Sequence, residues 1–282
     1  MQHYPQGTLY VVATPIGNLA DISLRALHVL NLVDAIGCED TRHTQGLLRM
    51  FGIEKPLLAV HEHNELEAAA GVIDRLQRGE RVAYVSDAGT PAVSDPGARL
   101  VAAVRTAGLR VMPLPGASSV TTALSAAGVQ GNSGFVFAGF LPSKAGERDS
   151  AVGKLQSEVK AVVMMEAPHR IEALAAAMAL LGERPITVCR ELTKQFEEIA
   201  TTPAGQMAAW LAAGPQRTRG EFVLVLHPLA VAPAADDGQR VLGLLLAELP
   251  LKTAVRLAAD ITGAPRNGLY DTALRLKNDG HL

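Results

Sequence analysis

Short apolar runs that alternate with helical segments constrain the fold of this chain most strongly. In the first half, strands are expected at residues 9–14, 35–38, 57–60, 81–85 and 110–114. The residues between these runs carry apolar side chains at helical spacing. Such alternation predicts an open α/β sheet covered by helices. In a sheet of this kind, ligands bind where the carboxyl ends of the strands meet.

A second set of strands follows a Gly-rich change of composition at residues 128–134. Its strands are expected at residues 135–140, 161–165, 186–190 and 222–227, and they need not all run parallel. A linker rich in Pro and Ala at residues 228–237 then precedes further helices. These helices are expected at residues 239–249, 251–262 and 265–277. The predicted domains are two α/β domains, residues 1–128 and 129–228, and a linker with a helical extension at 229–282.

Composition excludes several classes of protein. With 48% hydrophobic and 19% charged residues, the chain can bury a core, which excludes global disorder. Its formal net charge of −2 implies that any nucleic acid is bound by a local basic patch. Two distant cysteines, no signal peptide and no apolar run of about 20 residues predict a cytoplasmic protein without a membrane partner. No Cys/His cluster has zinc spacing. His61 and His63 would point the same way on an extended segment and could hold a metal, but a polar rim or a substrate contact is expected there instead, so no metal is predicted.

Three turns rich in Gly, Pro and Ser follow predicted strands of the first sheet. They are ATPIGN at residues 13–18, SDAGTPAVSDPG at 86–97 and PLPGASS at 113–119. Small residues let backbone groups approach a ligand closely, and hydroxyls and carboxylates add directional contacts. These turns are poor in Lys and Arg, which suits an amine- or sulfonium-bearing cofactor better than a pyrophosphate. The alternative is that the turns only reverse the chain and their carboxylates cap helices.

Several longer motifs resemble those of the tetrapyrrole methylase family of S-adenosylmethionine-dependent methyltransferases. They are LYVVATPIGNLADIS at 9–23, EDTRHTQGLL at 39–48, VSDAGTPAVSDPG at 85–97, PLPGASS at 113–119, FAGFLP at 137–142, EAPHRI at 166–171, RELTKQFEE at 190–198 and GEFVLVL at 220–226. The resemblance covers residues 8–227, and the tail also resembles the helical extension of one branch. That branch methylates the 2′-hydroxyl of a cytidine in 16S rRNA.

The resemblance implies a two-domain α/β fold with S-adenosylmethionine in the cleft between the domains, a homodimer, and 16S rRNA within the small ribosomal subunit as partner. It also implies which residues bind the cofactor. They are Pro15, Gly17, Asp87, Ala88, Gly89, Thr90, Val93, Ser118, Ser119, Met165 and Thr201.

Methyl transfer to a ribose hydroxyl requires alignment of the reactants and is helped by a base. The candidate catalytic residues are Asp40, His61 and Glu166. The residues expected to bind substrate are Glu39, Arg42, His63, Asn64, His169, Arg170, Lys252, Arg256 and Arg266. The last three belong to a tail segment, residues 251–277, whose charge is positive and whose helices resemble a helix-turn-helix. Each of these side chains could instead serve an interdomain salt bridge or a solvated rim, and the tail could only pack or dimerise.

Two other functions remain open at this stage. The first is a methyltransferase of the same fold that acts on a tetrapyrrole or a protein. The second is a non-catalytic ribosome-binding protein that has kept the fold but not the cofactor.

Overall fold

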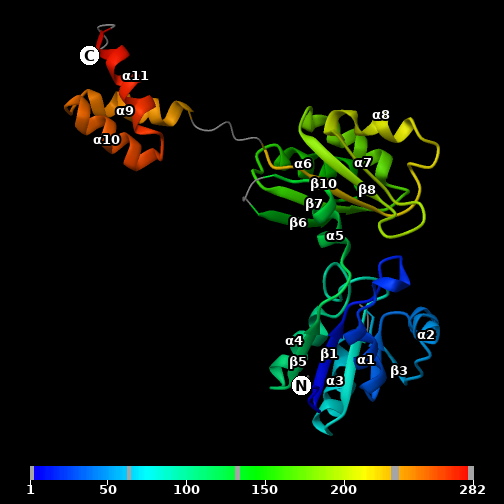
Figure 1. The fold of residues 1–282 in the computed structure, drawn as a ribbon. Coiled ribbons are helices and arrows are strands. Elements are labelled where there is room, and N and C mark those ends of the chain that lie inside the picture. Colours follow the sequence, from blue (N-terminus) through cyan, green and yellow to red (C-terminus); the bar gives the residue numbers. More distant parts are fainter. Residues whose placement is uncertain (1–2, 62–64, 131–133, 230–234, 279–282) are drawn as a thin grey trace. The chain divides into compact units, whose positions relative to one another are not determined.

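The computed structural model describes residues 3–61, 65–130, 134–229 and 235–278 (Figure 1). Residues 1–229 form one compact unit and residues 230–282 form another. The predicted division at residue 128 falls inside the first unit, between its two sheets, and it stays a prediction.

The first sheet is parallel throughout, as the strand–helix alternation predicts. Its strands are β1 (Thr8–Val12), β2 (Ala35–Cys38), β3 (Leu57–Ala59), β4 (Arg81–Val85) and β5 (Arg110–Leu114), in the order β3-β2-β4-β1-β5. The helices are α1 (Leu24–Leu32), α2 (Thr41–Met50), α3 (Glu65–Gln77), α4 (Ala98–Thr106) and α5 (Ser119–Ala126), with one 3-10 turn, η1 (Leu19–Asp21). Because the strands are parallel, all their carboxyl ends lie at one edge of the sheet.

Both faces of this sheet are buried, which explains its nearly continuous apolar strands. Tyr10 and Val12 point to the core that contains α1 and α2. Leu9 and Val11, which alternate with them, point to the core that contains α3 and α4.

The second sheet is mixed. Its strands are β6 (Phe135–Phe140), β7 (Ala161–Glu166), β8 (Pro185–Arg190), β9 (Glu198–Pro203) and β10 (Phe222–Leu226), in the order β6-β7-β10-β8-β9. Only the pair of β6 and β7 is parallel among these neighbours. Its helical segments are α6 (Ala145–Leu155), α7 (Ile171–Met178), η2 (Ala179–Leu181), η3 (Ala204–Gln206) and α8 (Met207–Ala212). Strand β9 was not predicted, because this half-exposed edge strand has no apolar run.

Helix α5 connects the two sheets. It follows β5 of the first sheet, and its Val120 and Ala123 pack in a core with Val163, Cys189 and Val225 of the second sheet. The third turn of the first sheet, directly before α5, is therefore held against the second sheet.

The second unit consists of three helices, as the sequence predicts. They are α9 (Ala235–Leu246), α10 (Leu251–Thr262) and α11 (Arg266–Asn278), and Leu242, Ala258 and Leu269 are among the side chains of their common core. Helix α9 begins inside the segment predicted as linker, four residues earlier than expected. Gly263 ends α10 in the left-handed conformation with φ of 71°. Within the described ranges, no helix combines the length and hydropathy needed to span a bilayer.

Candidate active site

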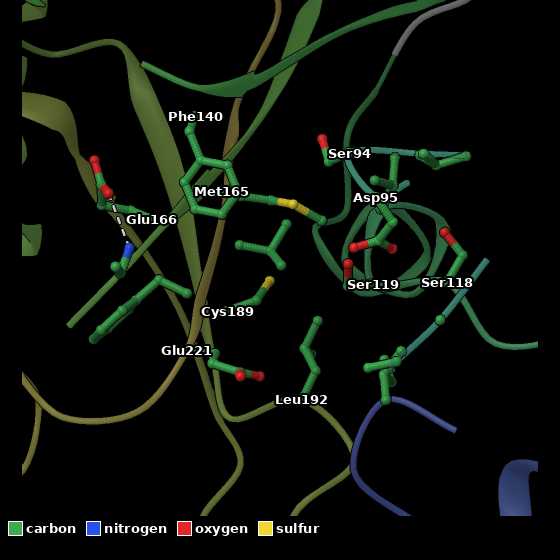
Figure 2. A pocket seen from close by; sticks show the side chains of 18 of the residues that line it. Ser94, Asp95, Ser118, Ser119, Phe140, Met165, Glu166, Cys189, Leu192 and Glu221 are labelled. Atoms are coloured by element: carbon green, nitrogen blue, oxygen red, sulfur yellow. Dashed lines mark hydrogen bonds between the residues drawn. The ribbon is translucent and has the colours of Figure 1, made fainter. Parts of the chain in front are cut away.

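A cavity with a mixed polar and apolar lining and a volume of about 370 Å³ lies within the first unit (Figure 2). Small-molecule sites have volumes of about 300 Å³ or more. One wall comes from loops of the first sheet and the start of α5. These residues are Ile16, Ala88, Gly89, Thr90, Val93, Ser94, Asp95, Ser118, Ser119 and Val120. The other wall comes from the second sheet. These residues are Phe140, Met165, Glu166, Ala167, Pro168, Cys189, Leu192, Glu221, Phe222 and Val223.

Hydrogen bonds tie the three predicted turns into one wall. Thr14 and Gly89 exchange two backbone hydrogen bonds, with N–O distances of 2.9 and 3.0 Å. The Thr14 hydroxyl also donates to the carbonyl of Ser86 at 3.1 Å. The Thr90 hydroxyl donates to the carbonyl of Ala117 at 3.0 Å, which joins the long loop to the third turn. These hydrogen bonds hold the three turns together at one edge of the sheet.

The end of the long loop is held in an unusual backbone conformation. Ala92 and Ser94 have positive φ angles of 66° and 64°. Gly97, with φ of 120°, packs so closely on Tyr84 that a Cβ would lie 2.3 Å from the ring. Buried Glu65 accepts hydrogen bonds from the amides of Gly97 and Leu100 at 3.0 and 2.9 Å. Such conformations persist only where the surroundings impose them, and they are frequent at functional sites.

The second-sheet wall is mostly apolar, but it carries two carboxylates with cationic partners. The fully buried Glu166 carboxylate lies 3.0 Å from Nε of Arg170 and accepts a hydrogen bond from the amide of Ala167 (Figure 2). Nη2 of Arg170 also donates to the carbonyl of Leu141. The Glu221 carboxylate lies 3.0 Å from Nζ of Lys194.

The remaining carboxylate of the lining is Asp95. Figure 2 shows it with Ser118 and Ser119 on the first-sheet wall, with Phe140 and Met165 on the other wall. Burial raises the pKa of Asp95 to about 6, and the nearby Glu39 and Asp87 carboxylates add to this shift. Lys, Arg and His are absent from the lining among the residues that the structure describes. The cavity therefore favours a ligand with positive charge.

Seven of the predicted cofactor-binding residues line this cavity. They are Ala88, Gly89, Thr90, Val93, Ser118, Ser119 and Met165. The other four lie outside the lining. Pro15 is buried, and Gly17 lies under Lys194, whose Cγ would be 2.5 Å from an added Cβ. Asp87 accepts from the amide of Asp40 at 3.3 Å, and the hydroxyl of Thr201 lies 2.7 Å from that of Thr187. Their roles stay predictions.

The three candidate catalytic residues lie in different surroundings. Asp40 caps the N-terminus of α2 and pairs with Arg42 at 3.0 Å, so its pKa is lowered to about 2. Glu166 lines the cavity but is paired with Arg170. His61 is half-buried after β3 and is not part of the lining. Their catalytic roles stay predictions, although a carboxylate with so low a pKa is a weak base.

The predicted substrate-binding residues belong to both units, and each unit is described by itself. The Arg42 side chain is 89% exposed and His169 is exposed, whereas Glu39 is half-buried. His63 and Asn64 lie outside the described residues. In the second unit, Arg256 and Arg266 share Asp260 as an ion-pair partner, at 3.5 and 3.0 Å, and Lys252 is exposed. The roles of all these residues stay predictions.

Sequence reasoning missed much of the second-sheet wall. The cavity residues not selected from the sequence are Ile16, Ser94, Asp95, Val120, Phe140, Ala167, Pro168, Cys189, Leu192, Glu221, Phe222 and Val223. Most are apolar side chains on strands or at strand ends, where no motif distinguishes a pocket wall from a core. Asp95 lies in the long loop that the sequence singled out, but it was not among the candidate catalytic residues.

Comparison with known proteins agrees with this architecture. The sequence model of the Tetrapyrrole (Corrin/Porphyrin) Methylases matches residues 8–208. A second model, described as the RsmI C-terminal HTH domain, matches residues 232–277. Among solved structures, diphthine synthase has a TM-score of 0.59 at 15% identity, covering 78% of this chain and 90% of that chain. A uroporphyrin-III-C-methyltransferase from Thermus thermophilus has a TM-score of 0.54 at 20% identity, covering 78% and 94%.

The chain belongs to the tetrapyrrole methylase family. Its sequence identity to some curated relatives is higher than to these solved structures. A protein of Neisseria meningitidis serogroup B named ribosomal RNA small subunit methyltransferase I is 50% identical over 276 residues, 96% of this chain and 94% of the relative. A protein of the same name from Pseudomonas aeruginosa is 49% identical over 275 residues, 95% and 97% of the two chains. The expected family, its fold and S-adenosylmethionine as methyl donor are thereby confirmed.

The residues of the cavity fit this cofactor. S-adenosylmethionine carries a sulfonium and an ammonium group, and the lining offers carboxylates and hydroxyls without an opposing Lys or Arg in the described chain. The apolar second-sheet wall suits the flat adenine ring. Ala88, Gly89, Met165 and Val223 are among the lining residues that would hold the cofactor.

Proposed function

We propose that this chain transfers a methyl group from S-adenosylmethionine to the 2′-hydroxyl of a cytidine ribose in 16S rRNA of the small ribosomal subunit. The observation that carries the proposal is the cavity at the carboxyl edge of the first sheet, whose lining contains no basic residue in the described ranges. The names of its relatives, which include ribosomal RNA and the small subunit, support the substrate.

The chemistry divides between cofactor and protein. S-adenosylmethionine supplies an activated methyl group on a sulfonium, so the protein mainly aligns the acceptor and excludes water. Ser118 and Ser119 stand at the start of α5, where hydroxyls and amides can orient polar groups. Phe140 and Met165 keep the opposite wall apolar. Under this proposal, these groups would orient the ribose hydroxyl toward the methyl group.

Binding of RNA requires positive charge outside this cavity. Arg42 lies on α2, which follows the carboxyl end of β2, and its side chain is almost fully exposed. In the helical unit, phosphates would be contacted by exposed Lys252 and by Arg256 and Arg266. This fits the match of residues 232–277 to a model of a helix-turn-helix domain. We propose that these residues position the rRNA and that the protein acts in the cytoplasm as a homodimer.

The test uses purified protein, labelled S-adenosylmethionine and small ribosomal subunits from a strain that lacks this protein. Label should appear on one cytidine ribose, located by nuclease digestion and mass spectrometry. Naked 16S rRNA and a tetrapyrrole serve as parallel substrates. Cofactor binding measured by calorimetry without label in RNA would overturn the rRNA substrate. Absence of cofactor binding would overturn the enzymatic function itself.

A further inference from the structure

The three carboxylates that line the cavity are not equivalent. Glu166 is paired with Arg170 and Glu221 with Lys194, both at 3.0 Å. The Asp95 side chain makes no hydrogen bond or ion pair within the described part of the chain. An anion held by a cation is a poor proton acceptor, since protonation would break the pair. Asp95 is therefore the lining carboxylate best able to accept a proton.

The loop around Asp95 is built so that this residue faces the cavity. Ser94, directly before it, has a positive φ of 64°, and Pro96, directly after it, has a fixed φ. The carbonyl of Pro96 accepts a hydrogen bond from the amide of Ala92 at 3.2 Å, which closes the loop. Beyond it, Gly97 is anchored on Glu65 at 3.0 Å. These constraints limit the movement of Asp95, as required of a group that transfers protons.

Among the residues that the structure describes, the charged groups that act on Asp95 are carboxylates. Glu39 follows β2 and Asp87 follows β4, and both carboxylates repel a charge on Asp95. Tyr84 of β4 lies nearby, and burial raises its pKa, so it stays neutral. Across the cavity, Glu166 and Glu221 have their own cations. The pKa of Asp95, about 6, lies where a carboxylate is ionised at neutral pH yet still basic enough to take a proton.

We propose that Asp95 is the general base of the methyl transfer, an inference that rests on the proposed function. The ribose O–H bond breaks and its proton goes to a carboxylate oxygen of Asp95. The ribose oxygen uses the freed electron pair to form the bond to the methyl carbon, and the sulfur keeps the electrons of the bond that breaks. The sulfonium charge and the carboxylate charge disappear together, so the step balances.

The first test is the pH dependence of turnover with saturating cofactor and small ribosomal subunits. Wild-type kcat should fall below about pH 6, because a protonated Asp95 cannot act as base. Asp95→Asn should reduce kcat by about 100-fold or more and abolish this acid-side fall. Asp95→Glu should restore part of the activity. Glu221→Gln is the matched control from the same cavity, and its acid-side fall should persist.

The second test does not depend on activity. In the cofactor-free protein with carbon-13-labelled Asp side chains, the nuclear magnetic resonance signal lost in Asp95→Asn should titrate near pH 6. Glu39→Gln removes a repelling charge, so both this titration and the acid side of the kcat profile should move to lower pH.

The outcomes separate the two proposals. If wild-type protein labels no RNA, the proposed function fails. If wild-type protein is active and Asp95→Asn keeps its kcat and its acid-side fall, only the base assignment fails. If Asp95→Asn weakens cofactor binding in calorimetry but keeps kcat, Asp95 binds the cofactor and is not the base.

Discussion

The contact between Glu65 and the start of α4 yields a quantitative prediction. Gly97 precedes α4 and has no side chain to cap it, so Glu65, at the start of α3, accepts from the amides of Gly97 and Leu100. A hydrogen bond to a charged group contributes about 1.5–3 kcal/mol. Glu65→Ala should therefore cost about 3 kcal/mol or more, because both amides lose their partner in a buried site.

The matching change in melting temperature can be worked out from the size of the unit. For about 150–250 residues, 1 kcal/mol corresponds to roughly 2–4 °C, so Glu65→Ala should lower Tm by roughly 6–12 °C. Glu65→Gln keeps both bonds as neutral ones of about half the strength and should lose about half as much. Exposed Glu67, on the same helical turn, is the control, and Glu67→Ala should change stability by no more than about 0.5 kcal/mol.

Differential scanning calorimetry of the full chain would measure these differences. Equal losses in Glu65→Gln and Glu65→Ala would refute the hydrogen-bond argument, and so would a loss of less than about 1 kcal/mol in Glu65→Ala. Because the same contact anchors the loop that carries Asp95, Glu65→Ala should also weaken cofactor binding. Unchanged affinity in the folded variant would show that the loop does not depend on this anchor.

Three further predictions concern other contacts of the first unit. Gly17→Ala places a Cβ 2.5 Å from Cγ of Lys194, so the first turn or the segment of Leu192 and Lys194 must shift, and cofactor affinity in calorimetry should fall about tenfold. Arg184→Ala removes four guanidinium hydrogen bonds to backbone carbonyls. It should cost about 3 kcal/mol or more in urea unfolding followed by the fluorescence of the single tryptophan. His227 is bonded to Thr187 at 2.8 Å, and burial, with Arg184, lowers its pKa below 6.5. The unfolded chain then binds more protons, so stability should fall as pH drops below 6.5, and His227→Gln should reduce this slope in melting curves from pH 5 to 7.5.

Sequence alone predicted the parts of this structure that depend on local pattern. The strands of the first sheet are apolar runs between turns, and parallel pairing brings the turns of residues 13–18, 86–97 and 113–119 to one edge. The second-sheet wall could not be predicted in the same way. Glu221 and Leu192 reach the cavity because β10 pairs with β8 in an antiparallel register, which is a tertiary property.

Sequence alone also could not show which acidic residue is suited to act as a base. Asp40 and Asp95 both follow strands of the first sheet in motifs of similar composition. Folding gives Asp40 a helix N-terminus and Arg42 as partners, which lowers its pKa to about 2. Folding gives Asp95 burial and two like charges, which raises its pKa to about 6. The partners of Asp40 are local, whereas the burial of Asp95 and the nearby Glu39 carboxylate depend on tertiary structure, so only the first shift could be read from the sequence.

The distribution of charge explains how a chain with a net charge of −2 can act on an anionic polymer. Cations that lie close to the cavity are engaged by carboxylates, Arg170 by Glu166 and Lys194 by Glu221. The interior of the site therefore keeps a field that attracts a sulfonium and repels phosphate. Exposed cations such as Arg42 remain available at the surface. Under the proposed function, the RNA phosphates stay outside the cavity and one neutral ribose hydroxyl enters it. The cavity thus selects the acceptor oxygen by excluding the phosphates that flank the target ribose.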